Sequence, residues 1–266
     1  MDTTTLSTPK PLRTVREPRI DLVGRQVLDP AGIQQFLDQH GVTWQTDTDT
    51  GGEALAEMAG RVCYMSYGKG RKTNKEFLGH IVEVGHGSVL EHAVWSFIIS
   101  GVSRSLTHEL IRHRHFSYSQ LSQRYVDESD SEFVEPEVIA SDPALHEIWS
   151  EAVNATRAAY DRLIAGLQDK YVDMTDKTLR RKLARQAARS VLPNATETKI
   201  FVTGNARALR HFIEIRGSEF ADVEIRQLAL ATLAIMQREA PAMFGDYTIE
   251  TLADGTRAVR TPHPKV

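Results

Sequence analysis

The densest run of chemically functional side chains lies between Glu109 and Tyr125, in the sequence ELIRHRHFSYSQLSQRY. From Arg112 to Arg124 it holds three arginines, two histidines and three serines, and no carboxylate. Cations this close together repel one another, and a bound anion removes that cost. Arginine suits phosphate and planar groups because its donors form a rigid fork. The composition therefore predicts an anion site, with a nucleotide as one candidate ligand and a solvated charged surface as the alternative interpretation.

Other nucleophiles are scarce. Cys63 is the only cysteine, and its place on an expected apolar helix stripe favours a structural role over a catalytic thiolate. Ser117, Ser119 and Ser122 have no Asp or Glu close by in the sequence to orient a histidine base. Ser122 is therefore interpreted as a ligand-binding hydroxyl rather than as a nucleophile.

Sequence motifs for metals and for phosphate loops are missing. The histidines have neither H-E-x-x-H spacing nor a cysteine partner, so no metal is expected. No G-x-G-x-x-G or Walker A sequence occurs, and Gly68–Lys72 lacks the required spacing. We interpret Gly68–Lys72 as an exposed basic loop.

The composition is that of an ordinary globular chain of 266 residues, with 41% hydrophobic and 25% charged side chains. The formal net charge of -3 gives no global attraction to nucleic acid or to anionic membranes. No apolar run reaches the length of a membrane span, and a single cysteine fits a reducing compartment. We expect a cytoplasmic protein with a disordered tail over residues 1–19 and one domain over residues 20–266.

The elements that must position the arginine-rich segment follow from caps and apolar spacing. Helices are predicted at residues 53–65, 73–84, 104–113, 142–170, 176–190, 205–216 and 222–239. Strands are predicted at 93–101 and 196–203, before a terminal hairpin of 247–252 and 256–260. Because strands and helices do not alternate strictly, we predict an α+β fold, with a mixed or antiparallel sheet flanked by helices.

Two of these helices carry predictions about the side chains that face inward. In the helix at 104–113, with Ser103 as N-cap, the inward residues are expected to be Leu106, Leu110 and Ile111. In the helix at 53–65, the expected buried stripe is Leu55, Met58, Ala59, Val62 and Cys63.

The pattern Arg112-His113-Arg114-x-x-Ser117-x-x-x-x-Ser122-x-Arg124 resembles the RHRxxSxxxxSxR signature of flavin-dependent thymidylate synthases. The similarity extends upstream to residues 85–92 (GHGSVLEH) and downstream to residues 185–193 (RQAARSVLP). It also takes in Asn205-Ala206-Arg207 and the pair His211 and Arg216. The resemblance thus runs from about residue 53 to residue 247.

The resemblance implies methylation of dUMP to dTMP, with 5,10-methylenetetrahydrofolate as carbon donor and without a cysteine nucleophile. FAD reduced by NADPH is implied as the hydride carrier. The residues implied to bind FAD are Ser88, Arg112, His113, Arg114, Gln120, Asn205, Ala206, Arg207 and His211. Those implied to surround dUMP are Glu109, Leu110, Ile111, Arg112, Gln120, Leu121, Ser122, Gln123, Arg124, Arg189 and Arg216.

Two roles within the dUMP set are more specific. Arg124 and Arg189 are expected to hold the phosphate, because two guanidinium forks can engage one dianion. Arg216 is expected to be catalytic, stabilising negative charge as it develops on the uracil ring.

The resemblance also implies a homotetramer whose sites are shared between subunits. Arg216 with Glu109–Arg112 would come from one chain, and Gln120–Arg124 with Arg189 from its neighbour. No membrane or nucleic-acid partner is expected. Two other functions stay open: an RNA-binding protein, which the overall acidity disfavours, and a flavoprotein reductase without methyl transfer. Such a reductase would lack the second arginine set, Arg124, Arg189 and Arg216.

Overall fold

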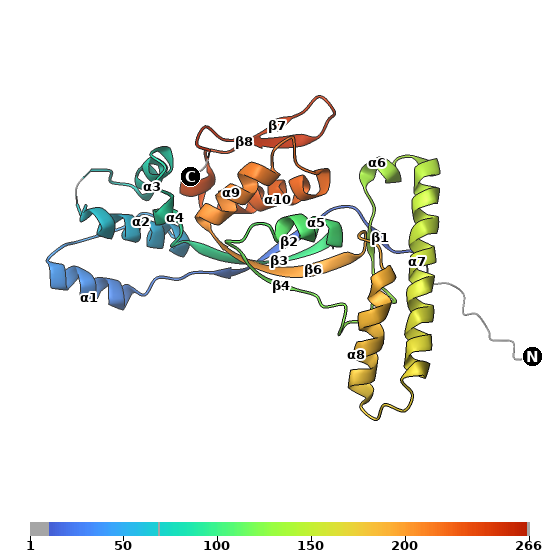
Figure 1. Cartoon of the computed structure of the whole chain (residues 1–266). Coiled ribbons are helices and arrows are strands. Elements are labelled where there is room, and N and C mark those ends of the chain that lie inside the picture. The colour runs from blue at the N-terminus through green and yellow to red at the C-terminus, as the bar shows by residue number, and fades with distance from the viewer. Residues whose placement is uncertain (1–10, 69, 265–266) are drawn as a thin grey trace, which may run out of the picture. The chain divides into compact units, whose positions relative to one another are not determined.

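The computed structural model describes residues 11–68 and 70–264. It consists of helices and a central antiparallel sheet (Figure 1), which confirms the predicted α+β class. The chain divides into two compact units. We call Met1–Glu17, Gly101–Ser105 and Leu121–Thr198 the helical unit, and Pro18–Ser100, Leu106–Gln120 and Lys199–Val266 the sheet unit. The single-domain assignment stays a prediction.

The main sheet has four strands in the order β2-β3-β6-β4. Their bounds are Arg19–Arg25 (β2), Val94–Ser103 (β3), Glu197–Asn205 (β6) and Ser117–Gln120 (β4). β2 is antiparallel to β3, and β4 is antiparallel to β6. Along β3, Trp95, Phe97 and Ile99 are buried while Ile98 is exposed, the alternation expected of a strand covered on one face.

Helices and a hairpin complete the sheet unit. They are α1 (Pro30–His40), α2 (Gly51–Tyr64), α3 (Asn74–Glu83), α4 (Gly87–Leu90), α5 (Arg104–Leu110), α9 (Ala206–Arg216), α10 (Val223–Glu239), α11 (Pro241–Phe244), β7 (Thr248–Thr251) and β8 (Arg257–Arg260). The capping box predicted for α3 is present, with Thr73 and Glu76 each bonding the other's backbone. α10 packs against β2, α9 and α11 through fully buried residues such as Leu228 and Met236. The predicted terminal hairpin is also confirmed.

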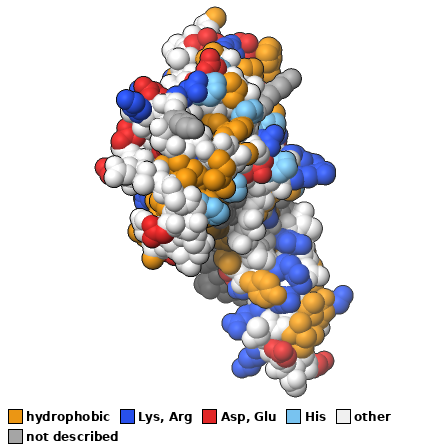
Figure 2. All heavy atoms as spheres, turned by 90° about the vertical axis from the view of Figure 1, so that its left-hand side faces the viewer, with side chains coloured by type: hydrophobic (Ala, Val, Ile, Leu, Met, Phe, Trp, Pro, Cys, Tyr) orange, Lys and Arg blue, Asp and Glu red, His pale blue; other side chains and the backbone are white. Residues whose placement is uncertain are grey.

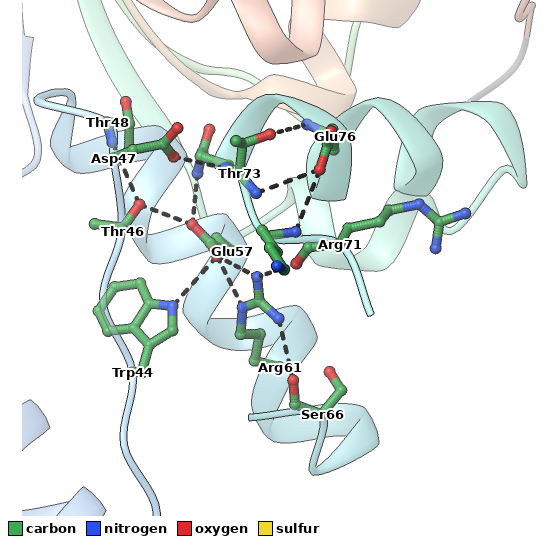
Figure 3. A network of polar contacts seen from close by, with 12 residues as sticks. Trp44, Thr46, Asp47, Thr48, Glu57, Arg61, Ser66, Arg71, Thr73 and Glu76 are labelled. Atoms are coloured by element: carbon green, nitrogen blue, oxygen red, sulfur yellow. Dashed lines mark hydrogen bonds and ion pairs between the residues drawn. The ribbon is translucent and has the colours of Figure 1, made fainter. Parts of the chain in front are cut away.

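The buried face of α2 is polar. Glu57 and Arg61, one turn apart, form an ion pair of 2.7 Å with side chains 1% and 5% exposed. Glu57 also accepts hydrogen bonds from Trp44 Nε1 at 3.3 Å, Thr46 Oγ1 at 2.8 Å and Asn74 Nδ2 at 2.9 Å (Figure 3). A buried ion pair is tolerated when its remaining donors and acceptors are satisfied in this way.

The buried stripe predicted for α2 is therefore wrong. Val62 and Cys63 are exposed, and Leu55, Met58 and Ala59 are only partly buried. The spacing of apolar residues does not predict a buried helix face when that face is occupied by an ion pair such as Glu57–Arg61. In α5 the helix ends at Leu110, so the predicted inward residue Ile111 is also exposed.

The predicted basic loop, Gly68–Lys72, follows α2 and is anchored to Arg61. Arg61 donates to the carbonyl oxygens of Ser66 and Arg71, both at 3.1 Å (Figure 3). Arg71 and Lys72 are exposed, as predicted, and Lys69 lies outside the described residues.

The helical unit contains α6 (Glu137–Ala140), α7 (Pro143–Lys170), α8 (Lys177–Ala188), a 3-10 turn at Arg189–Val191 and the strands β1 (Thr14–Val15) and β5 (Phe133–Val134). α7 begins at the predicted Asp142 cap and packs against α8. β1 pairs with β5 in parallel. Within the expected disordered tail, Thr14–Val15 and Arg19 thus lie in strands, and residues 1–10 lie outside the described residues; the tail stays a prediction. In residues 11–68 and 70–264, no helix is long and apolar enough to cross a membrane; the cytoplasmic location stays a prediction.

Candidate active site

The first half of the arginine-rich segment forms a tight turn between α5 and β4. The Tyr118 hydroxyl donates to the carbonyl oxygens of Leu110, at 2.6 Å, and His113, at 2.8 Å. Burial raises the pKa of Tyr118 well above its ordinary value, so the hydroxyl keeps its proton. Backbone bonds from His113 to Leu110 and from Phe116 to His113 close the turn. The backbone of residues 111–115 is thereby held in one conformation.

Aromatic side chains pack against the turn at residues 111–116. The rings of His113 and Phe116 lie 6.0 Å apart, and both contact Phe212 of α9, at 5.2 and 5.9 Å. Gly204 of β6 permits this approach, because a Cβ there would lie 2.5 Å from the Phe116 ring. The turn and α9 are thus packed against each other within the sheet unit.

Arg216, in the last turn of α9, is held by residues of the turn and α5. Its Nη1 atom donates to Glu109 Oε2 at 2.6 Å and its Nη2 atom to the Glu109 carbonyl at 3.3 Å. Its Nε atom donates to His113 Nε2 at 3.1 Å. The Arg216 side chain is 19% exposed, so it is held by these bonds and is still reachable from solvent.

His113 is neutral in this arrangement. Burial, the positive charge of Arg216 and the neighbouring His211 lower the pKa of His113 to about 4. A neutral imidazole can accept the Arg216 hydrogen bond at Nε2, whereas an imidazolium could not. The charge of Arg216 is therefore offset by one carboxylate only.

A cavity of about 190 Å³ opens beside this turn. It is lined by Arg112, His113, Arg114, His115, Ala208 and His211. The structure thus brings together four residues predicted to bind FAD, from the turn and from α9. His115 and Ala208 were not predicted; both lie one or two positions from predicted residues, and only the turn and helix geometry reveals that they face the same space.

Of the other predicted FAD residues, four lie at the start of α9 and in α4, and Gln120 lies in β4. Arg207 pairs with Glu91 at 2.6 Å, just after α4. Asn205 caps α9 by accepting from the Ala208 backbone at 2.8 Å, and Ala206 is fully buried. Ser88 is exposed on α4. Asn205 thus already has a structural role as a helix cap.

Gln120 ends β4 and donates to Thr107 Oγ1 of α5 at 3.1 Å. Leu110 is buried, so any contact from it to a ligand would come from its backbone. These two residues complete the predicted set in the sheet unit.

The other predicted dUMP residues belong to the helical unit: Leu121, Ser122, Gln123, Arg124 and Arg189. Gln123 Nε2 and Arg124 Nε are buried nitrogens without a hydrogen-bond partner in the part of the chain described. Donors in that condition favour an added acceptor. Arg189 is exposed at the C-terminal end of α8, close enough to Arg104 to help lower its pKa, which burial lowers most.

Tyr125 and Lys182 stand beside Arg124 and were not predicted. The ammonium of Lys182 lies 4.9 Å from the Tyr125 ring centre, and the Arg124 guanidinium 6.0 Å from it. A hydrogen bond and the charge of Lys182 lower the pKa of the Tyr125 phenol. Arg185 also donates to the Tyr125 carbonyl at 2.6 Å. Lys182 lies on a helix face rich in basic residues. Such a face is expected from the sequence to be solvent-exposed, so the sequence does not indicate the contact of Lys182 with Tyr125.

The predicted site residues of the sheet unit and those of the helical unit have similar chemistry. In each, arginines accompany planar or aromatic side chains, and within the described ranges no group of three metal-ligating residues occurs. Figure 2 shows histidine side chains gathered beside exposed apolar ones on one face of the molecule. Fold and site together define an α+β protein equipped to bind anionic, planar ligands.

Comparison with known proteins narrows this class. The model of the family described as thymidylate synthase complementing protein matches residues 46–242. Proteins named flavin-dependent thymidylate synthase from Mycobacterium avium (strain 104) and Mycobacterium tuberculosis (strain H37Rv) are 57% identical over 230 residues, 85% of this chain and 92% of each relative. The one from Mycobacterium marinum is 56% identical over 231 residues, 86% of this chain and 92% of the relative. The chain belongs to the family of flavin-dependent thymidylate synthases.

Proposed function

We propose that the protein methylates dUMP to dTMP, with FAD as its bound cofactor. Methylenetetrahydrofolate would give the carbon, and NADPH would reduce the flavin. The observation that supports this most directly is the fixed guanidinium of Arg216 beside the Arg112–His115 turn. Family membership over most of the chain supports the same reaction.

The donors around the cavity fit FAD by their chemistry. Arg112, Arg114 and His211 are exposed at its edge and carry no ion pair among the described residues. A pyrophosphate and a flavin ring present acceptors and a planar surface, which arginine and histidine bind well. FAD, when bound, would supply the reducing equivalents of the reaction. Ser88, Gln120, Asn205, Ala206 and Arg207 would extend this contact.

Arg216 would activate the pyrimidine. Its charge, held by Glu109 and by a neutral His113, would stabilise an electron-rich uracil ring more than the neutral ring. Because the guanidinium is already fixed, little reorganisation would be needed as that charge develops. Glu109 and His113 would then act as positioning residues for Arg216.

The helical unit would supply the phosphate contacts. Arg124, with its buried donor unsatisfied, and Arg189 would each present a guanidinium to the dianion. Gln123, whose amide nitrogen is also unsatisfied, and Ser122 would add neutral donors. Such contacts act on the ground state and the transition state alike, and so would chiefly set affinity.

The test is the visible spectrum of purified protein together with an assay of dTMP formation. We expect flavin absorption, a change in that absorption on adding dUMP, and dTMP only when methylenetetrahydrofolate and NADPH are both present. Colourless protein that does not respond to added FAD would refute the proposal. Flavin reduction by NADPH without any dTMP would instead favour a reductase.

A further inference from the structure

Within the described residues, one buried arginine outside the candidate active site lacks an acceptor at two of its nitrogens. Arg226, in the first turns of α10, is 4% exposed. Its Nε and Nη1 atoms are buried and have no hydrogen-bond partner, and within residues 11–68 and 70–264 the guanidinium makes no ion pair. Removing a guanidinium from water is costly unless an acceptor replaces the water. An acceptor for Arg226 is therefore to be expected.

The other deeply buried arginines of the sheet unit show how this chain normally meets that requirement. Arg61 is 4% exposed and pairs with Glu57 at 2.7 Å. Arg210 is 1% exposed and pairs with Asp246 through two bonds, of 2.6 and 2.8 Å. Arg226 differs from both because no carboxylate is hydrogen-bonded to it in the described chain.

Asp254 is a carboxylate on which the charge of Arg226 acts, and it is already engaged elsewhere. Asp254, in the turn between β7 and β8, accepts from the Thr256 backbone at 2.9 Å and from the Thr256 hydroxyl at 2.7 Å. The charge of Arg226 reaches Asp254 only as a weak electrostatic effect, the smaller part of what lowers the Asp254 pKa after the Thr256 bonds. Asp254 therefore does not substitute for a hydrogen-bonded partner.

Arg226 lines a cavity of about 230 Å³ between α10 and the hairpin turn. Thr256 and Arg257 border the same space, and Arg257 is exposed with no ion pair to the described residues. The volume is below the range of about 300–1,000 Å³ typical of sites for drug-sized ligands. It suits a small group, and two arginines that line the same space suit a negative one.

We propose that this cavity binds an oxyanion, a phosphate or carboxylate group held by Arg226 and Arg257. The site shares no residue with the one around Arg216. The oxyanion comes either from a small molecule in solution or from an acidic side chain of a second copy of this chain. Both sources offer the same oxygens to the same guanidinium donors.

The first experiment measures binding of inorganic phosphate by calorimetry to the flavin-loaded protein saturated with dUMP, which occupies the active-site arginines. Wild type is compared with Arg226→Met, which keeps the apolar stem, and with Arg238→Met. Arg238 is exposed on the same helix and, among the described residues, donates to the Ala234 carbonyl alone, so it is the matched control. We expect phosphate affinity to fall about tenfold or more in R226M and to stay unchanged in R238M.

The second measurement is the oligomeric state of the same three proteins by light scattering. If the oxyanion belongs to a second copy, wild type will not bind added phosphate here, and R226M will form smaller assemblies than R238M. A carboxylate partner is then identified as the source. Phosphate binding that depends on Arg226, with the assembly unchanged, identifies a free oxyanion.

A third measurement uses the wild-type protein alone, so it does not require that a variant folds. Wild-type crystals are soaked in selenate, whose selenium is located by anomalous scattering, and a peak is expected between Arg226 and Arg257. The proposal is overturned if wild-type crystals show neither a selenate peak nor a neighbouring carboxylate at Arg226. It is equally overturned if R226M matches R238M in both phosphate affinity and assembly.

Discussion

The charge on Arg216 depends on two neighbours with different chemistry. Glu109 contributes a carboxylate at 2.6 Å, and His113 contributes a neutral acceptor at 3.1 Å. A second carboxylate in place of the imidazole would give the cluster a net negative charge, and an imidazolium would repel the guanidinium. The pairing therefore orients Arg216 while leaving part of its charge available to a ligand.

This arrangement separates Arg216 from Arg124 by role. Arg216→Ala should lower turnover more than dUMP binding, because its charge matters most as the ring becomes electron-rich. Arg124→Ala should chiefly weaken dUMP binding. Each loss should be on the order of ten- to a hundred-fold, as for a charge-assisted contact. Steady-state kinetics and dUMP titration measure both; equal losses of binding with turnover intact would contradict the division.

The low pKa of His113 makes the folded protein sensitive to acid. Unfolded, a histidine has a pKa near 6.5; folded, His113 has a pKa of about 4. Between these values the unfolded chain binds the proton and the folded chain does not, so stability falls as pH decreases from 6.5 to 4 and is complete above 6.5. We expect this one group to account for a loss on the order of 3 kcal/mol by pH 4, at about 1.4 kcal/mol for each unit by which the two pKa values differ.

Urea unfolding at pH 7, 6, 5 and 4.5 measures this loss. His113→Gln, which cannot titrate, should show a shallower decline than wild type over that range. His92→Gln, at an exposed position, is the control and should keep the wild-type slope. Parallel curves for wild type and H113Q would show that His113 is protonated equally in both states.

Cys63 is exposed at the end of α2, so the sequence argument that placed it in the core no longer supports its exclusion as a nucleophile. The proposed flavin chemistry still predicts that it is dispensable. Cys63→Ala should fold normally, since surface substitutions usually change stability by about 0.5 kcal/mol or less, and should retain dTMP formation. Loss of all activity in a folded, flavin-bound C63A protein would restore the thiol to consideration.

Among the secondary-structure elements, the close approach of β6 to the Arg112–Phe116 turn is the most sensitive contact. A Cβ on Gly204 would lie 2.5 Å from the Phe116 ring. Gly204→Ala should therefore displace the ring and the turn, costing about 1–3 kcal/mol and weakening flavin binding. Thermal unfolding and FAD titration measure the two effects.

Gly79→Ala is the matched control. Gly79 lies in α3, where an added Cβ meets nothing within 4 Å, and alanine should stabilise that helix by about 0.5–1 kcal/mol. Equal stability of the two variants would show that the turn adapts to the added methyl group without strain.

Elements with strong local signals were predictable. Asp142-Pro143 marked the start of α7, and Thr73 with Glu76 marked the start of α3, because a cap and the first helical turn are encoded in adjacent residues. The same signal, Asp29 before Pro30, precedes α1, a helix that is not among the predicted ones. β4 could not be predicted in this way, since Ser117–Gln120 is polar and becomes a strand only by pairing with β6.

The candidate site was predictable in its residue types but not in its contacts. The Arg112–Arg124 signature gave the anion chemistry. The bond from Arg216 to His113 joins residues 103 positions apart, and no local pattern encodes it. Likewise the partner of Lys182, the Tyr125 ring, is known only from the packing of the helical unit.

In the whole molecule, the predicted dUMP residues fall into two sets. Arg216, Glu109 and Arg112 belong to the sheet unit, whereas Arg124 and Arg189 belong to the helical unit. This division follows the one predicted from the family resemblance, in which each dUMP is held by two chains, except at Gln120, which was predicted to lie with Arg124 and belongs to the sheet unit. The coincidence motivates a test that does not require the assembly to be solved.

Arg189→Ala and Arg216→Ala homo-oligomers should each be nearly inactive, since each lacks one arginine at every site. Co-expressed, some pairs of chains combine the intact Arg216 of one with the intact Arg189 of the other, and those sites are complete. Activity measured on tag-purified mixed oligomers should therefore recover in part, although neither chain carries both arginines. If mixed oligomers of verified composition remain as inactive as their parents, each site is built within one chain. The shared-site prediction would then be wrong while the proposed reaction could still stand, because dTMP formation by the wild type tests the reaction independently.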